Sequence, residues 1–311
     1  MKKLLLLAVA CVAALTVLPG SARAITGNFV EDNEHPFVGL VAFYSKVGGG
    51  SDDFMWRCSG SLLTDRVFLT AGHCTDQDAE ESPVFARIWF HQDVGSQYNP
   101  PSVPFDPRTG YPEKCIEGDP LCVEATLLFD FGFDNFRGFP NIHDVGLIIL
   151  PEDQAVELSE YGVLAPAGFL DSLDTGTLKN ATFTVAGYGV SRTNPAQTLS
   201  FRERLMAQTK VTNPNLNASS NTGGFNLQLS SAPGGGRGGT CFGDSGGPTF
   251  YGGFSSNVIV GVNSWLFGFN RQTCGGTGFA FRTDTEAVIS WILGIVEQYA
   301  PSELSEIQFA D

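Results

Sequence analysis

The chain has 311 residues, of which 33 are acidic and 18 basic, so its formal net charge is −15. This acidic excess disfavours a nucleic-acid-binding protein, because binding to a phosphate backbone requires a basic surface. The chain is also longer than a typical single hydrophobic core, so we expect one unit built from two packed subdomains.

The first 24 residues have the pattern of a signal peptide. Met1-Lys2-Lys3 precedes fifteen uncharged, mostly apolar residues, and Ala22-Arg23-Ala24 offers a cleavage site. Pro19-Gly20 ends the apolar run before it reaches the length of a membrane-spanning helix. We therefore expect a secreted protein, extracellular or periplasmic, without membrane attachment once the signal is removed. The start is typical of a bacterial leader, and the remaining 287 residues carry a formal charge of −18.

Six cysteines remain after this segment, namely Cys58, Cys74, Cys115, Cys122, Cys241 and Cys274. An even number in an exported chain suggests three disulfides, for which fifteen pairings are possible. The short spacing of Cys115 and Cys122 suits a local bridge. The sequence contains no Cys-x-x-Cys pair and only four histidines, which disfavours a zinc site.

Short β-type runs separated by turn residues predict an all-β fold. The runs are Phe37 to Tyr44, Ser61 to Thr70, Val84 to Phe90, Asp144 to Leu150, Ala181 to Tyr188 and Val258 to Trp265. A helix is expected at about residues 285–299, capped by Asp284 or Thr285 and ended by Pro301. Residues 92–141, 151–176 and 230–239 are rich in turn residues and are expected to be surface segments, the last too glycine-rich for a regular strand.

The first candidate for chemistry is His73, in Leu69-Thr70-Ala71-Gly72-His73-Cys74. Histidine accepts and returns protons near neutral pH, because its usual pKa is about 6.5. A lone histidine beside a cysteine could equally be a metal ligand or a core residue.

The second candidate is Asp144, which precedes the apolar run from Val145 to Leu150. A carboxylate at this place can accept the second imidazole N–H, select the reactive tautomer and stabilise the imidazolium. An isolated aspartate before a strand is more often a turn residue, and the adjacent His143 is interpreted as a loop residue.

The third candidate is Ser245, in Cys241-Phe242-Gly243-Asp244-Ser245-Gly246-Gly247-Pro248. A serine hydroxyl becomes a good nucleophile when a base takes its proton and nearby donors stabilise the oxyanion. The flanking glycines allow a sharp turn that directs the N–H groups of Gly243 and Ser245 at one negative charge. Taken alone, Gly-Asp-Ser-Gly could be an ordinary turn.

Together, in the order His73, Asp144, Ser245, the three segments resemble the trypsin/chymotrypsin family of serine proteases over nearly the whole mature chain. The resemblance implies two packed antiparallel six-stranded β-barrels at about residues 25–160 and 161–285, followed by the C-terminal helix. It also implies the disulfides Cys58–Cys74 and Cys241–Cys274, which leave Cys115 with Cys122. Ala186-Gly187-Tyr188-Gly189 resembles the family's Gly-Trp-Gly strand.

The resemblance also assigns an activating terminus and a substrate pocket. Ile25-Thr26-Gly27-Asn28 resembles the family's Ile-Val-Gly-Gly start, so signal removal is expected to create a terminus that pairs with Asp244. The expected pocket residues are Gly239, Thr240, Ser264, Trp265, Leu266 and Gly278, with the Ser264 hydroxyl supporting Asp144. Gly239 replaces an acidic pocket base and Leu266 replaces a glycine. The expected residue before the scissile bond (P1) is therefore apolar or small rather than Arg or Lys.

The resulting hypothesis is a secreted serine endopeptidase that works through an acyl-enzyme, acts on polypeptides, meets protein inhibitors and needs no cofactor or metal. A different class remains open, namely an inactive homologue that acts as a secreted binding protein. Reaction of Ser245 with an organophosphorus or sulfonyl fluoride reagent would distinguish the two. An α/β-hydrolase esterase is disfavoured, because its Gly-x-Ser-x-Gly elbow precedes the histidine in the chain.

Overall fold

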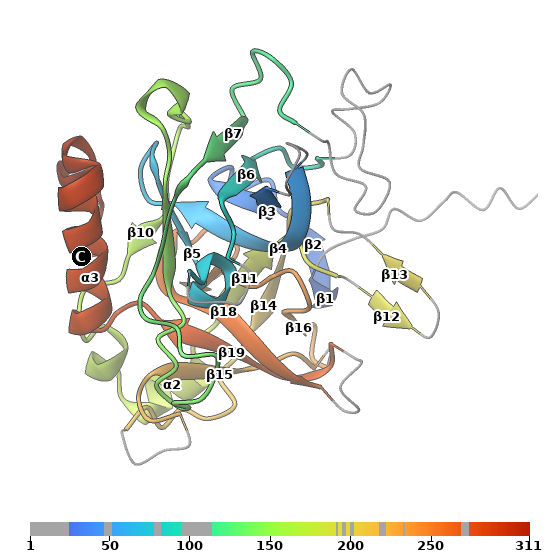
Figure 1. Ribbon diagram of the computed structural model, residues 1–311. Helices are drawn as coiled ribbons and strands as arrows, with labels where there is room; N and C mark the ends of the chain where they lie inside the picture. Colours follow the sequence, from blue (N-terminus) through green and yellow to red (C-terminus); the bar gives the residue numbers. More distant parts are fainter. Residues whose placement is uncertain are drawn as a thin grey trace, which may run out of the picture.

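The computed structural model describes residues 25–46, 52–77, 82–94, 114–190, 192–194, 197–199, 202–217, 222–232, 234–268 and 274–311. The expected signal segment, residues 1–24, lies outside them. Two large sheets make up most of the described chain, and the C-terminal helix α3 (Glu286–Tyr299) lies along one side of the molecule, drawn in red in Figure 1. This mostly β architecture confirms the expected all-β class.

The first sheet has seven strands in the order β7-β6-β3-β4-β5-β9-β8. They are β3 (Val38–Lys46), β4 (Asp52–Leu62), β5 (Val67–Thr70), β6 (Phe85–Trp89), β7 (Cys122–Ala125), β8 (Leu127–Asp130) and β9 (Gly146–Ile149). Only Thr126 separates β7, which pairs with β6, from β8, which pairs with β9. The two act as one bent strand and bring the sheet close to a closed six-stranded barrel, which removes free edges.

The second sheet has eight strands, seven of them in the order β15-β19-β18-β17-β11-β14-β2, with β10 beside β18. They are β2 (Phe29–Glu31), β10 (Val163–Leu164), β11 (Phe183–Gly187), β14 (Leu205–Thr209), β15 (Asn226–Ser230), β17 (Pro248–Tyr251), β18 (Val258–Gly268) and β19 (Gly276–Arg282). A bridge between Val211 and Leu229 joins the chain after β14 to β15. This bridge connects the two ends of the six-strand path β15-β19-β18-β17-β11-β14. Strands β2 and β10 lie outside that path.

The remaining elements are short. Strand β1 (Thr26–Gly27) pairs with β16 (Gly238–Gly239), and β12 (Arg192–Asn194) pairs with β13 (Gln197–Leu199). The helices are α1 (Gly72–Thr75) and α2 (Thr175–Asn180), with 3-10 turns η2 (Glu152–Gln154), η3 (Leu170–Ser172) and η5 (Pro301–Ser305). The N-terminal segment thus reaches the second half of the chain twice, through β1 and through β2.

Two local expectations are wrong in part. The run from Ser61 to Thr70 is not continuous, because the Thr64 hydroxyl accepts from the N–H groups of Arg66 and Val67 and so stabilises a turn between β4 and β5. Residues 230–239 were expected to hold no strand, yet Gly238 and Gly239 form β16. Glycine has a low strand propensity, but pairing with Thr26 and Gly27 supplies the backbone hydrogen bonds that make these two residues a strand.

Helix α3 begins as expected, with the Thr285 side chain accepting from the N–H of Val288. Its buried residues Val288, Ile292 and Val296 join the larger core, and Trp291 contacts Phe131 with ring centroids 5.4 Å apart. The end of the chain therefore closes over the first sheet. Within the described part of the chain, no helix has the length and apolarity needed to cross a membrane.

Candidate active site

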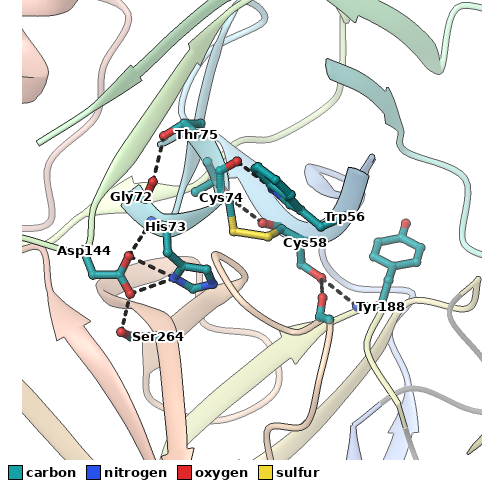
Figure 2. The surroundings of a disulfide bond; sticks show 12 residues. Trp56, Cys58, Gly72, His73, Cys74, Thr75, Asp144, Tyr188 and Ser264 are labelled. Atoms are coloured by element: carbon teal, nitrogen blue, oxygen red, sulfur yellow. Dashed lines mark hydrogen bonds and ion pairs between the residues drawn. A yellow bond between two sulfur atoms is a disulfide. The ribbon is translucent and has the colours of Figure 1, made fainter. Parts of the chain in front are cut away.

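His73 and Asp144 meet where α1 approaches the start of β9 (Figure 2). Asp144 is fully buried and accepts from the backbone N–H of His73 at 2.8 Å, while His73 Nδ1 lies 3.0 Å from each carboxylate oxygen. Ser264, on β18, donates its hydroxyl to Asp144 Oδ2. Nδ1 therefore carries the proton, which leaves Nε2 of the partly exposed imidazole free to act as a base.

The electrostatics of this pair reflect a competition between burial and attraction. Burial alone would lower the pKa of His73, but the charge of Asp144 and the hydrogen bond to it raise that pKa above its usual value. Burial would likewise raise the pKa of Asp144, but His73 and the Ser264 hydrogen bond lower it. Asp144 thus stays ionised and His73 is a stronger base than a free imidazole.

The short helix α1 is held in place on both sides. The disulfide between Cys58 and Cys74 ties it to β4, and Trp56 Nε1 donates to the carbonyl of Cys74 at 2.9 Å (Figure 2). On the other side, the hydroxyl of Thr75 donates to the carbonyl of Phe129 at 2.9 Å. These contacts fix the backbone that presents His73. The structure also forms Cys115–Cys122 and Cys241–Cys274, the pairing implied by the resemblance.

Ser245 lies in a tight turn between Cys241 and Gly246. Gly243 has φ of 94°, a conformation that favours glycine, and the N–H of Asp244 donates to the carbonyl of Cys241 at 3.1 Å. The Ser245 carbonyl accepts from the N–H of Ser59 at 2.7 Å, which connects the turn to β4. Among the described residues, the N–H groups of Gly243 and Ser245 meet no acceptor. Two free donors thus flank the Ser245 side chain, as an oxyanion site requires.

His73 and Ser245 line the same cavity, whose volume is about 290 Å³. Neither His73 Nε2 nor the Ser245 hydroxyl forms a hydrogen bond with any residue in the described ranges. Catalytic hydrogen bonds of this kind are often long without substrate and shorten in the complex. The same cavity therefore holds a potential base and a serine hydroxyl.

The chain is similar in sequence to known serine proteases. Residues 142–292, which include Asp144, Ser245 and Ser264, match the trypsin family model. The chain is 27% identical over 294 residues to the serine protease Hayan of Drosophila melanogaster, covering 89% of this chain and 40% of that protein. It is 30% identical over 135 residues to the CLIP domain-containing serine protease B10 of Anopheles gambiae, covering 42% of this chain and 33% of that protein. These matches support a trypsin/chymotrypsin-like serine protease.

Solved structures share the trypsin-like fold. An HL collagenase superposes with a TM-score of 0.55 at 19% identity, covering 89% of this chain and 98% of the collagenase. The thermostable serine protease AL20 from an extremophilic microorganism gives a TM-score of 0.52 at 17% identity, covering 82% of this chain and 94% of the AL20 chain. By contrast, the chain spans only 33% and 40% of the lengths of the two curated relatives.

Four of the six expected pocket residues, Thr240, Ser264, Trp265 and Leu266, line the cavity that contains Ser245. Gly239, in β16, and Gly278, paired with Leu266 across β18 and β19, are not among its lining residues. No acidic residue lines the cavity among the described residues.

The two residues of the expected activation pair, Ile25 and Asp244, are both buried. Asp244 is fully buried and accepts from the N–H groups of Gly189 and Cys241, both at 2.8 Å. No cationic side chain in the described part of the chain pairs with Asp244, and burial raises its pKa to about 7 despite these two hydrogen bonds. Ile25 is also fully buried. Its neighbour Thr26 is anchored beside the oxyanion turn, donating its hydroxyl to the carbonyl of Gly239.

Sequence reasoning missed an aromatic surface beside the site. Phe136 and Phe242 line the catalytic cavity with 41% and 47% of their surfaces exposed. A second cavity of about 670 Å³ adjoins the first through Phe136 and Trp265, and its other lining residues are Phe139, Gln228, Phe267 and Phe279. The density of phenylalanine between residues 129 and 139 was the available signal, but only the fold brings that segment over His73.

The residues around His73 do not form a usable metal centre. Among the described residues, the potential ligands that cluster together are Cys58, His73 and Cys74. Both sulfurs are joined in a disulfide, so neither can act as a thiolate ligand.

Proposed function

We propose that this protein is a secreted serine endopeptidase in which Ser245 is the nucleophile, His73 the general base and Asp144 the orienting acid. The observation that carries the proposal is the joint arrangement of a carboxylate-bound imidazole and a serine hydroxyl on one cavity, in a turn where the N–H groups of Gly243 and Ser245 meet no acceptor among the described residues. Each feature has an ordinary structural explanation, but their combination matches the requirements of acyl transfer.

The proposed reaction begins when Nε2 of His73 takes the proton of the Ser245 hydroxyl and Oγ attacks the scissile carbonyl carbon. The carbonyl oxygen becomes negatively charged and accepts from the N–H groups of Gly243 and Ser245. As the C–N bond breaks, His73 returns the proton to the departing amine and leaves an acyl-enzyme. Water, activated by the same imidazole, hydrolyses the ester and releases Ser245.

The decisive test uses the chain that begins at Ile25, exposed to a fluorophosphonate reagent and to a peptide library. We expect labelling of Ser245 and cleavage of internal peptide bonds. Ser245→Ala should abolish labelling and lower kcat by a factor on the order of 10⁶. A folded parent protein that neither labels nor cleaves would favour the alternative, an inactive homologue that binds a partner. Cleavage that survives in Ser245→Ala would overturn the assignment of the nucleophile.

The proposed P1 preference is for a small or apolar side chain rather than Arg or Lys. The cavity wall carries Leu266, and the position of the acidic pocket base is Gly239. A cationic side chain would lose its hydration without gaining a carboxylate partner, which is unfavourable. The adjoining aromatic cavity further supports apolar residues on the amino-terminal side of the scissile bond. The peptide-library profile would reveal both preferences.

We also propose that removal of residues 1–24 creates the active terminus, whose ammonium pairs with Asp244. Ile25 has φ of 57°, which a β-branched residue strongly disfavours. Cutting the bond before Ile25 removes the preceding carbonyl and with it this strain. The new ammonium would also give the buried Asp244 carboxylate the cation that it lacks.

This activation model predicts that the exact position of the terminus controls activity. One added residue before Ile25 should lower kcat/KM at least a hundredfold, because the ammonium could no longer reach Asp244 and the oxyanion turn would lose its support. The measurement compares purified extended and exact forms whose termini have been sequenced. Equal activity of the two forms would contradict the activation model and leave the catalytic assignment intact.

Three disulfides are consistent with an extracellular protein. Secretion, whether into a periplasm or the medium, remains part of the proposal, as do polypeptide substrates and protein inhibitors as partners. Residues 25–311 would form a single peptidase domain of two barrels and a helix. Its site draws His73 and Asp144 from one half and Ser245 and Ser264 from the other.

A further inference from the structure

We infer that Ser59 is a positioning residue for the proposed oxyanion site, because its hydroxyl connects the turn that holds Ser245 to the chain after β11. The hydroxyl donates to the carbonyl of Gly243 at 2.9 Å and accepts from the N–H of Tyr188 at 2.9 Å. Ser59 is fully buried, in β4. The inference rests on the proposed endopeptidase function and adds a residue that acts through the turn and not by contact with substrate.

The contact falls on the middle one of three consecutive peptide groups. The first carries the N–H of Gly243 and the third carries that of Ser245, which are the two donors of the proposed oxyanion site. The Ser59 hydroxyl holds the carbonyl of the peptide group between them. Gly243 has φ of 94°, and a glycine changes its backbone conformation readily. The hydrogen bond on the middle peptide group therefore restrains the direction of one donor relative to the other.

Three successive backbone N–H groups after β11 hold this turn. The N–H of Gly189 donates to the Asp244 carboxylate at 2.8 Å. The N–H of Val190 donates to the carbonyl of Phe242, also at 2.8 Å. The N–H of Tyr188 reaches the turn through the serine hydroxyl described above. Removal of that hydroxyl would leave the buried N–H of Tyr188 without this acceptor and would release one of the three connections.

The same strand also holds the segment that presents the histidine. The backbone N–H of Ser59 donates to the carbonyl of Ser245 at 2.7 Å. The preceding residue, Cys58, forms the disulfide with Cys74 in α1, the helix that contains His73. Two adjacent residues of β4 thus hold the segments that carry the proposed base and nucleophile. A looser turn is expected to slow the chemical step and to leave the affinity for substrate nearly unchanged.

The first test compares kcat and KM of Ser59→Ala with those of Ser61→Ala. Ser61 is the matched control, because it is a fully buried serine on the same strand whose hydroxyl has no hydrogen-bond partner within the described residues. Ser59→Ala should lower kcat about tenfold, the usual effect of one hydrogen bond, with little change in KM. Ser61→Ala should leave both constants unchanged. The loss is smaller than the roughly 10² to 10³ expected for removal of an oxyanion donor, since both donors remain.

A peptide aldehyde separates positioning from general destabilisation, because its adduct with Ser245 places a negatively charged oxygen in the oxyanion site. Its Ki should rise about tenfold in Ser59→Ala, in parallel with the fall in kcat, and should not change in Ser61→Ala. Fluorophosphonate titration gives the concentration of competent sites in every preparation. A parent that neither labels nor cleaves would refute the proposed function, whereas normal kcat and Ki in a labelled Ser59→Ala enzyme would refute only the role of Ser59.

The second test uses the parent enzyme and does not depend on the folding of any variant. Binding of the aldehyde should slow amide hydrogen exchange at Tyr188 as well as at Gly189 and Val190, because all three N–H groups are connected to the turn. In folded Ser59→Ala, the slowing should disappear at Tyr188 and persist at the other two. Exchange at Tyr188 that is unaffected by the aldehyde in the parent would overturn the inference.

Discussion

At the scale of single residues, the site depends on how Asp144 determines the state of His73. The carboxylate is buried, accepts three hydrogen-bonding contacts from His73 and one from Ser264, and raises the pKa of the imidazole. Because the neutral imidazole is the base, activity is expected to fall as the pH drops through that raised pKa. Removing the charge of Asp144 should therefore change both the rate and its pH dependence.

We predict that Asp144→Asn lowers kcat by about 10⁴, since an amide no longer selects the reactive tautomer. Burial would then act on His73 without an opposing charge, so the pKa of the imidazole should fall and the acid limb of kcat/KM should move to lower pH. Asp153→Asn, in η2, is the matched control for loss of one charge. A variant with normal kcat, or with an acid limb at higher pH than the parent, would contradict this account.

The residues of the proposed triad were predictable because each lies in a local motif that the resemblance to the family made specific. Phe136 was not, because the phenylalanines between residues 129 and 139 do not by themselves show which part of the molecule that segment covers. Phe136 becomes notable only when its loop covers His73. Contacts between distant segments carry this information, and a single sequence does not display them.

At the scale of elements, the C-terminal turn η5 meets the turn between β4 and β5 where Glu303 lies near Asp65 and 3.9 Å from Arg66 Nη1. Burial raises the pKa of Asp65 to about 6, and the neighbouring Glu303 adds to this rise. Burial would also raise the pKa of Glu303, but its interactions with Asp65, Thr64 and Ser302 lower it. In mildly acidic solution Asp65 therefore binds a proton in the folded state.

We predict that this pair makes the fold more stable as the pH falls from about 7 to 5. A carboxyl whose pKa is raised in the folded state binds a proton that the unfolded chain does not, so its contribution is lost as the pH rises through about 6. Asp65→Asn should gain about 2 °C in melting temperature over the parent at pH 8, and less at pH 5. Both proteins should carry Ser245→Ala to prevent self-digestion. A melting difference independent of pH would show that Asp65 does not take up a proton in this range.

Strand pairing at this scale was only partly predictable. The alternation of apolar runs and turn residues predicted most strands, and the capped apolar stripe predicted α3. The pattern of apolar and turn residues could not predict β16, because Gly238 and Gly239 have a low strand propensity and form a strand only by pairing with β1. It also could not assign β2 to the second sheet, since that choice depends on pairing with β14, far along the chain.

At the scale of the whole molecule, β1 pairs with β16, which precedes the turn that holds Ser245, across more than two hundred residues of sequence. Among the described residues no cationic side chain pairs with Asp244, and its pKa is raised to about 7 by burial. In the chain cut before Ile25, the proposed ammonium would keep Asp244 ionised. The stability of the two forms should therefore depend differently on pH.

We predict crossing stability profiles for the cut and the extended forms, both carrying Ser245→Ala. In the extended form the folded state takes up a proton near pH 7 that the unfolded state does not bind until about pH 4. Its melting temperature should therefore rise as the pH falls from 8 to 5. In the cut form the ion pair should be strongest between about pH 5 and 7. It should weaken above pH 8 as the ammonium loses its proton, and below pH 4 as the carboxylate gains one. Asp244→Asn should make the two profiles parallel, because neither form then has a titrating group at this position. Parallel profiles in the parent pair would mean that the terminus and Asp244 do not interact, whatever the activity of the enzyme.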